Sequence, residues 1–423
     1  MDVQIAKNYE NFLKETALKD SSELNDLKNI NFNNFKKQGL PTKRNEDWKQ
    51  SSLNDYLKNS ENLTIFNDKQ LRFRISKIEK FKHNKIVLFN GQLQKCEFEQ
   101  DDFNKITVLN IEDYFKNNNK NLLKLFTNKK NPLVSLNNSL SCFGIYLEVK
   151  ESVKFLFPVI IYNNYDEDVN QKQIFQKNYF VINANSNIEI LEKYQVKNKN
   201  TLININSNID VLNNSNCKNY ILNSDNEDNC VFRFKKVNVQ SSGIYESFLF
   251  SSKIKTIRDE IEINLNEKLA ECYLYYLQFL KNYENHEIKV RINHFAESCK
   301  SYQFSKSIID DDAKGIYQGK IFVDSVAQKT NGYQLIKSLL LSDHSIFHSK
   351  PELEIYADDV KCSHGSSSTS LNKEELFYLM ARGITKNNAK KLIISGYLND
   401  LIEKISDEFF KDYFLQKIEE IFA

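Results

Sequence analysis

Apolar and polar residues alternate with a period of two between about residues 150 and 365. Clusters of Asn, Ser, Asp and Lys separate the alternating runs, and no helical pattern interrupts them. The clearest runs cover residues 188–190, 203–205, 209–211, 232–239, 261–265 and 353–355. This pattern predicts many short strands, as in a sandwich, a barrel or a β-solenoid. The repeated Asn-rich corners favour the solenoid, in which each coil buries its inward side chains on neighbouring coils.

Both ends of the chain have a helical period instead. Ile5, Tyr9 and Phe12 recur at helical spacing, and the chain is expected to be helical to about residue 60. Farther along, the pattern predicts a buried strand over 85–89 and another helix over 111–125. The N-terminal part is therefore expected to be helical or mixed.

After residue 371 the helical period returns. A first short helix is predicted through Leu376 and Leu379, ending at Arg382-Gly383, and Thr385 is suited to cap a second helix. The apolar face of the second helix is predicted to hold Ala389, Leu392, Ile393, Tyr397, Leu401, Ile402 and Ile405. A last amphipathic stretch contains Phe410, Phe414, Leu415 and Ile418. Such a helical module on a long β core commonly binds a partner or caps the core.

Length and charge narrow the classes of function. The 423 residues are enough for two or three folding units, or for one long solenoid. The 58 Lys and Arg nearly balance the 56 Asp and Glu, so a net charge of +2 gives no basic surface for nucleic acid. No apolar run reaches the roughly 20 residues of a membrane helix, and the first 25 residues do not resemble a secretory signal. We expect an intracellular protein without nucleic-acid or membrane partners.

Asparagine makes up about one residue in eight, whereas there are only 10 glycines and 4 prolines. Asparagine tolerates the left-handed backbone conformation better than most non-glycine residues. We therefore expect asparagine to form many of the turns that glycine forms in other proteins.

The clearest candidate for chemistry is the sequence Cys362-Ser363-His364. In a strand, Cys362 and His364 would share one face about 6.6 Å apart, with Asp358 and Val360 behind them. A thiolate and an imidazole suit iron or zinc, but two ligands cannot close a site. The remaining ligands must come from elsewhere in the fold or from another chain. The serine-rich residues 365–370 are interpreted as a loop that leads into the C-terminal helices.

Other motifs are missing from the sequence. The seven cysteines form no Cys-x-x-Cys pair, which argues against a zinc ribbon, a thioredoxin-type pair or a ferredoxin-type ligand set. There is no P-loop motif and no Gly-x-Gly-x-x-Gly fingerprint, so the chain is not expected to be an ATPase or a dinucleotide enzyme.

Several segments resemble one known family. The run KPELEIYADDVKCSHG, followed by LNKEELFYLMARGI, resembles the C-terminal signature of the SufB/SufD family of iron–sulfur cluster assembly proteins. Near the N-terminus, GLPTKRNEDWK resembles a second segment of that family. The resemblance is to the SufD type, because the SufB type lacks the Asp-Asp-Val-Lys-Cys-Ser-His run. It extends from about residue 35 to 400.

The resemblance implies a mainly β fold with some α: a right-handed parallel β-helix core between helical ends. The implied domains are an N-terminal helical or mixed region (1–130), the β-helix core (131–370) and a C-terminal helical domain that binds an ATPase (371–423). The implied protein is a non-catalytic scaffold that pairs with a SufB-like paralogue through the β-helix and carries a SufC-like ABC ATPase on its C-terminal helices.

The resemblance also implies site residues. His364 and Cys362 would hold iron or a nascent iron–sulfur cluster transiently in the complex, with no cofactor stably bound by the isolated chain. The residues implied in SufC binding are Leu376, Phe377, Tyr378, Arg382, Gly383, Ala389, Leu392 and Ile393. A homodimer in isolation stays open, and the expected compartment is the cytoplasm, or a plastid-type organelle in a eukaryote.

Two other functions remain as alternatives. Long β-helices also serve carbohydrate-active enzymes, which bind glycans in grooves lined by exposed aromatic residues. The chain has 52 aromatic residues, but 30 of them are Phe, the type most often buried. The other alternative is a metal-free adaptor, in which Cys362 and His364 only pack.

Overall fold

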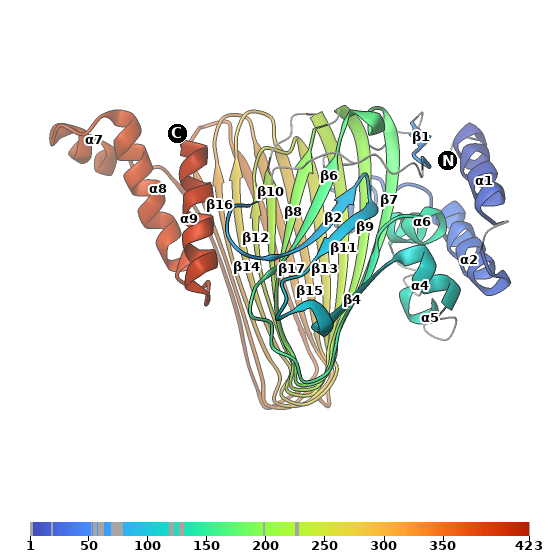
Figure 1. Ribbon diagram of the computed structural model, residues 1–423. Helices are drawn as coiled ribbons and strands as arrows, with labels where there is room; N and C mark the ends of the chain where they lie inside the picture. Colours follow the sequence, from blue (N-terminus) through green and yellow to red (C-terminus); the bar gives the residue numbers. More distant parts are fainter. Residues whose placement is uncertain are drawn as a thin grey trace.

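The computed structural model describes residues 3–17, 20–51, 53, 57, 63–68, 79–117, 122–126, 131–197, 199–224 and 228–422. A long β-solenoid lies between two groups of helices, one formed by each end of the chain (Figure 1). The predicted fold class, mainly β with a parallel β-helix core and helical ends, is confirmed. Within the described ranges, no helix is long and apolar enough to cross a membrane.

The solenoid consists of two sheets, which we call sheet A and sheet B. Sheet A contains β1 (Thr64–Ile65), β4 (Ile106–Asn110), β5 (Ile145–Val149), β7 (Lys172–Ile182), β9 (Lys199–Val211), β11 (Asp228–Val239), β13 (Thr256–Leu265), β15 (Asn285–His294), β17 (Lys314–Val323) and β19 (Ile346–Ile355). Sheet B contains β2 (Asn84–Phe89), β3 (Gln92–Glu97), β6 (Val159–Tyr165), β8 (Asn187–Val196), β10 (Asn216–Ser224), β12 (Ile244–Ser251), β14 (Glu271–Leu280), β16 (Lys300–Ile309), β18 (Thr330–Leu340) and β20 (Val360–Ser370). From β5 onward the chain alternates between the two sheets, so that each coil contributes one strand to each.

Strands of successive coils pair in parallel and in register. Ile244 of β12 lies beside Glu271 of β14, which lies beside Lys300 of β16, so successive coils are offset by 27 and 29 residues. All the runs of period two that predicted strands lie in strands of the solenoid. The predicted strand over 85–89 is also confirmed, as part of β2.

The corners of the coils repeatedly use left-handed backbone. Five non-glycine residues with positive φ are asparagines, Asn90, Asn185, Asn200, Asn214 and Asn282, with φ between 49° and 58°. The expectation that asparagine takes the place of glycine in turns is confirmed at these five positions, whereas eight other described positions with positive φ hold Ser, Gln, Lys, Leu or Asp.

The helices and short 3₁₀ turns occupy the two ends of the chain and a few connections. They are α1 (Val3–Ala17), α2 (Ser22–Gln38), η1 (Glu46–Trp48), η2 (Phe103–Lys105), α4 (Ile111–Asn117), α5 (Leu122–Leu125), α6 (Pro132–Leu140), η4 (Glu167–Val169), α7 (Lys373–Ala381), α8 (Lys386–Ile402) and α9 (Glu408–Phe422). The outer face of sheet B is covered by α8 and α9, where Phe410 stacks on Tyr220 at 4.1 Å and Phe414 lies 4.7 Å from Phe248. In Figure 1, α7 lies farthest from the solenoid.

Three predictions of secondary structure need correction. The N-terminal helices do not extend to residue 60: α2 ends at Gln38 because Gly39, with φ 69°, takes a conformation outside the helix; residues 52, 54–56 and 58–62 lie outside the described residues. The helix predicted over 111–125 is two helices, α4 and α5, with residues 118–121 outside the described part.

The third correction concerns residues 365–370, which do not form a loop. They are the second half of β20, paired in parallel with β18 from Gly365 beside Leu335 to Ser370 beside Leu340. Ser338 Oγ also donates to Ser368 Oγ at 2.7 Å. Pairing with a strand of the preceding coil supplies hydrogen bonds to this segment, and the sequence of the segment alone cannot predict them.

Candidate functional site

The predicted ligands Cys362 and His364 lie in the last coil of the solenoid. They belong to β20, where Cys362 pairs with Gly332 and His364 with Gln334 of β18. Among the described strands, β20 and β19 each have a neighbour on one side only, so the solenoid ends here with two unpaired strand edges. Pairing thus places the candidate residues at the open C-terminal end of the solenoid.

Both side chains are on the inward face of β20. Ser366, two residues after His364, meets Ser349 of the opposite sheet with 2.6 Å between their hydroxyl oxygens. Cys362 packs partly buried beside the interior cluster that includes Ile321 and Ala357, whereas His364 is exposed. The strand period of two therefore brings thiol and imidazole to one face, as the sequence predicted.

Asp358 does not belong to this face. It lies in a bend before β20 begins at Val360, and its side chain is exposed. Across the residues that the structure describes, no group of three or more His, Cys, Asp or Glu side chains is arranged to hold a metal ion. The described part of this chain thus holds the two predicted ligands at the open end and no third candidate arranged with them.

Burial raises the pKa of the Cys362 thiol. A hydrogen bond with the Gly332 backbone lowers this pKa and so offsets only part of the rise. A thiol in such surroundings keeps its proton at neutral pH until a metal or a base removes it.

The N-terminal GLPTKRNEDWK segment lies across the outer face of sheet A. Trp48 stacks under the guanidinium of Arg258 at 3.8 Å, and Asp47 pairs with Lys289 at 2.6 Å. Glu46 reaches Lys350 of β19, the last strand of sheet A, at 2.8 Å. Burial opposes ionisation of Asp47, but its hydrogen bond and ion pair with Lys289 outweigh it and lower the pKa of the carboxyl. This segment thus ties the N-terminal region to the last coil, which also contains the candidate site.

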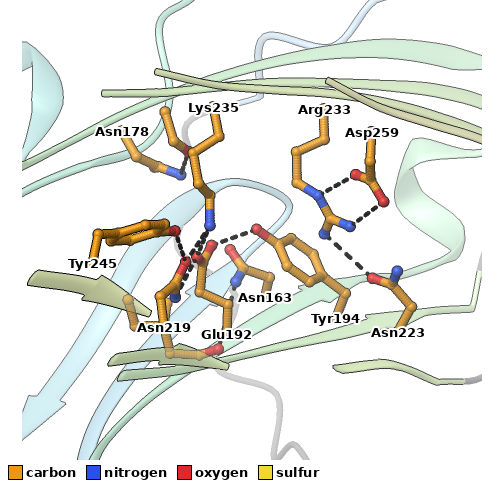
Figure 2. Close-up of polar contacts among 12 residues, drawn as sticks. Asn163, Asn178, Glu192, Tyr194, Asn219, Asn223, Arg233, Lys235, Tyr245 and Asp259 are labelled. Carbon is orange, nitrogen blue, oxygen red and sulfur yellow. Dashed lines mark hydrogen bonds and ion pairs between the residues drawn. The ribbon is translucent and has the colours of Figure 1, made fainter. Parts of the chain in front are cut away.

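The interior of the solenoid holds a polar network that the sequence did not reveal (Figure 2). Arg233 makes a bidentate pair with Asp259 at 2.6 and 2.8 Å. Lys235 pairs with Glu192 at 2.7 Å, and Glu192 also accepts hydrogen bonds from Tyr194 and Asn219. All of these side chains are buried. The sequence did contain the charged residues of this network, in the period-two run 232–239. Alternation alone, however, does not show which face of a strand points into the solenoid.

Two family models match the chain. The model described as "SUF system FeS cluster assembly, SufBD core domain" matches residues 164–397, more than half of the chain, and "SufBD protein N-terminal region" matches residues 2–161. This chain belongs to the SufB/SufD family. The core match contains the whole candidate site, and the N-terminal match contains the segment around Trp48.

Curated relatives place the chain with the SufD type. The iron–sulfur cluster assembly protein SufD of Escherichia coli is 33% identical over 172 residues, 41% of this chain and 40% of that protein. SufD of Plasmodium falciparum is 26% identical over 242 residues, 56% of this chain and 16% of the relative. The chloroplastic protein ABCI7 of Arabidopsis thaliana is 39% identical over 113 residues, 26% and 24% of the two chains. Each match spans less than half of the relative's length.

The residues expected to bind SufC divide into two groups in this SufD-type chain. Phe377 is 72% exposed, Tyr378 56% and Leu392 53%, and the Arg382 guanidinium lies 4.6 Å from the Tyr378 ring. Leu376 and Ile393 are half-buried, Gly383 ends the α7 turn with φ 86°, and Ala389 is fully buried. The exposed group could meet a partner directly, whereas Ala389 could act only through the packing of α8.

Proposed function

We propose that this SufD-type chain is a non-catalytic scaffold subunit that helps assemble iron–sulfur clusters, paired with a SufB-like paralogue and carrying a SufC-like ATPase. The observation that carries the proposal is the position of Cys362 and His364, inward-facing on the last strand of an open solenoid. Iron and the nascent cluster are the cargo of this process, and the ATP chemistry would belong to the partner.

The unpaired edges of β19 and β20 support pairing with another chain. These strands are 10 and 11 residues long, and most of their side chains are exposed or half-buried. A long unpaired edge presents free backbone donors and acceptors that another strand can use. A SufB-like paralogue meeting this edge would bring its own side chains next to His364.

The ligand count also supports a shared site. Iron prefers more than two ligands, and thiolate and imidazole are among those it accepts. The described residues of this chain supply only Cys362 and His364 at the open end. A cluster held here would therefore need ligands from the paralogue.

The C-terminal helices fit a role in carrying the ATPase. None of the side chains of α7 is buried, and it exposes Phe377 and Tyr378. In contrast, both α8 and α9 pack on sheet B, α8 through Ile394 and Leu398 and α9 through Phe410 and Phe414. A partner bound on α7 would thus be anchored to the solenoid through α8 and α9.

The test is anaerobic co-expression of this chain with the SufB-like and SufC-like subunits of the same organism. Bound iron and sulfide are measured for the wild type, for His364→Ala and for the matched control His348→Ala. His348 is also an exposed histidine, but on β19 it follows the inward-packed Phe347 and so faces outward. We expect His364→Ala to keep its subunits and lose most iron and sulfide, whereas His348→Ala keeps both.

Two other outcomes would contradict the proposal. If the complex forms and His364→Ala retains its metal, the chain acts as a metal-free adaptor. If no complex forms, the proposed partnership fails. ATPase binding is tested separately by Phe377→Ala, which should weaken retention of the SufC-like subunit, with Tyr283→Ala as control because Tyr283 is an equally exposed aromatic residue (71%) in a distant turn.

A further inference from the structure

One buried lysine joins the solenoid to the C-terminal helices. Lys306 lies on the outer face of sheet B, on strand β16, which α8 contacts, and its side chain is 3% exposed. Its ammonium group donates to the backbone oxygen of Tyr397 and to the carboxylate of Asp400, both on α8. The ammonium nitrogen also lies 4.3 Å from the centre of the Tyr397 ring. These contacts reach the C-terminal part of α8, where the helix dipole favours a cation.

Lys306 interrupts an apolar row on the outer face of sheet B. In the three preceding coils the same row contains Leu222, Phe250 and Leu277, one residue from each strand. All three are buried in the apolar cluster that sheet B forms with α8 and α9. A fourth apolar residue would pack in the same way, and a buried ion pair is commonly no more stabilising than apolar residues of similar volume. Stability alone therefore does not explain the lysine.

The apolar face of α8 does not by itself determine where the helix lies along sheet B. Its buried residues Ile394, Leu398 and Ile402 recur every four residues. A shift of the helix by one turn, about 5.4 Å, would therefore replace one large aliphatic side chain by another. Because apolar contact is not directional, such packing tolerates both positions.

Lys306 distinguishes these positions of α8. One turn before Asp400 the helix has Gly396, which has no side chain to offer, and one turn after it the chain has Lys404, which repels a second cation. In either shifted position the buried ammonium would lose its carboxylate partner, and a buried charge that loses its partner is strongly destabilising. Of these three positions, only the observed one pairs Lys306 with a carboxylate.

We propose that Lys306 is a positioning residue that fixes α8 at one position on sheet B and, through α8, fixes the place of α7. Helix α7 contacts α8 and joins it through residues 382–385, so a shift of α8 would move α7 with it. The consequence for the ATPase rests on the proposed function, in which α7 carries the SufC-like subunit. A fixed α8 would hold that subunit at one place relative to the open end of the solenoid.

The position of α8 is tested in the isolated full-length chain by the distance between two spin labels. The labels are attached through Asn387→Cys at the exposed start of α8 and Tyr283→Cys on an exposed turn of the solenoid. Cys96→Ser and Cys362→Ser first remove the two cysteines that are not buried. Lys306→Leu should broaden the single distance of the wild type or add a second one, displaced by up to about 5.4 Å. Lys306→Arg should keep the single distance, because a guanidinium can donate to the same two oxygens.

The matched control is Lys300→Leu, which removes an exposed lysine from the same strand. Lys300 pairs with Glu271 at 2.8 Å, and its side chain is 54% exposed. This variant should keep the distance of the wild type. Urea unfolding is measured on the same proteins, and Lys306→Leu should unfold at no lower urea concentration than the wild type. An unchanged narrow distance in Lys306→Leu, or a clear loss of stability in that variant, would overturn the proposal.

The consequence for function is tested in the co-expressed complex. Lys306→Leu should retain the SufC-like subunit and its rate of ATP hydrolysis but accumulate several-fold less iron and sulfide, because the ATPase is then carried at mixed positions. Unchanged iron and sulfide, or loss of the SufC-like subunit, would overturn this part of the proposal. If the wild-type complex itself does not form, the proposed function fails, whereas the spin-label distances still decide the role of Lys306 because they need no partner.

Discussion

The centre and the open end of the solenoid both have polar inward faces, but only at the centre are the polar side chains paired with one another. At the centre, Arg233 pairs with Asp259 and Lys235 with Glu192, and all four side chains are buried. At the end, Gln334 Oε1 and Gln303 Nε2 are buried without a hydrogen-bond partner, and His364 is exposed. Both regions are polar and both lie between the same two sheets. They differ in whether the chain satisfies its own polar groups.

This difference indicates which polar residues serve the fold. A buried ion pair that is complete within the chain needs nothing from outside, and its loss should be felt in stability. Unpartnered groups at an open end cost stability in the isolated chain, and they gain from an added strand, an ion or a metal. The centre is thus expected to respond to mutation as structure, and the end as a binding site.

The largest effect on stability is expected when one partner of a central ion pair is removed and the other stays buried. Asp259→Ala leaves the Arg233 guanidinium buried without its bidentate partner, which should lower the free energy of unfolding by about 3–5 kcal/mol. Urea unfolding followed by circular dichroism measures this change. The double variant Arg233→Met/Asp259→Leu should recover most of the loss, since it buries no unpaired charge. A loss below about 1 kcal/mol in the single variant would mean that water reaches the network.

A second, pH-dependent effect is expected at a buried lysine outside the central network. Lys177 on β7 donates to the amide oxygen of Asn138 at 2.6 Å, whereas Lys235 has a carboxylate partner. Burial lowers the pKa of Lys177 to about 7. The unfolded chain keeps this proton up to about pH 10, so between pH 7 and 10 it binds more protons than the folded chain, and stability rises with pH.

From pH 7 to 9 this lysine alone should add about 2 kcal/mol to the free energy of unfolding. Lys177→Met should remove that slope and be more stable than the wild type at pH 7, as measured by urea unfolding at pH 7, 8 and 9. Lys199→Met is the control, because Lys199 is exposed on the neighbouring strand β9. Parallel pH slopes for the wild type and Lys177→Met would refute a buried neutral lysine.

A smaller effect is expected at the glycine facing Gln334. Gly319→Ala forces the Gln334 amide to move and brings the new methyl within 2.9 Å of the Tyr317 ring, which should cost about 1–3 kcal/mol. Gln334→Ala in the same chain should return part of that loss, so that the two substitutions are not additive. Purely additive thermal-unfolding results would show that the amide does not occupy the space over Gly319.

The sequence predicted the architecture better than the interior. Period-two runs and Asn-rich corners were sufficient for a solenoid, because strand alternation and left-handed turns are local properties. Which face of a strand points into the solenoid is not a local property, because it depends on how the strand packs in the fold. Phe232 and Phe234 were the apolar half of their run, yet they pack outward beside Trp48, while Arg233 and Lys235 face the interior. Both faces of β11 are buried, so alternation could not indicate which was inward.

The candidate site was partly predictable for the same reason. That Cys362 and His364 share a face follows from their spacing, and the strand extends well beyond them. The position of the buried Gln334 beside His364 could not be recognised, because it depends on pairing between strands 30 residues apart in sequence. The serine run after Gly365 was misread for a related reason, since its partner strand is remote in sequence.

The smallest effect on stability is expected at the open end itself. His364 is exposed and makes no hydrogen bond or ion pair within the described residues, so His364→Ala should change the free energy of unfolding by less than about 0.5 kcal/mol. Cys362→Ala should cost somewhat more, because its thiol packs beside Ile321 and Ala357. Thermal unfolding of the isolated chain measures both.

A fall of more than about 1 kcal/mol in His364→Ala would show that the histidine supports the last coil, and loss of metal in that variant could then no longer be ascribed to a missing ligand. An unchanged stability together with lost iron and sulfide in the complex would separate the two regions as the structure suggests: charges that hold the solenoid together at its centre, and a histidine at its end that is used by what binds there.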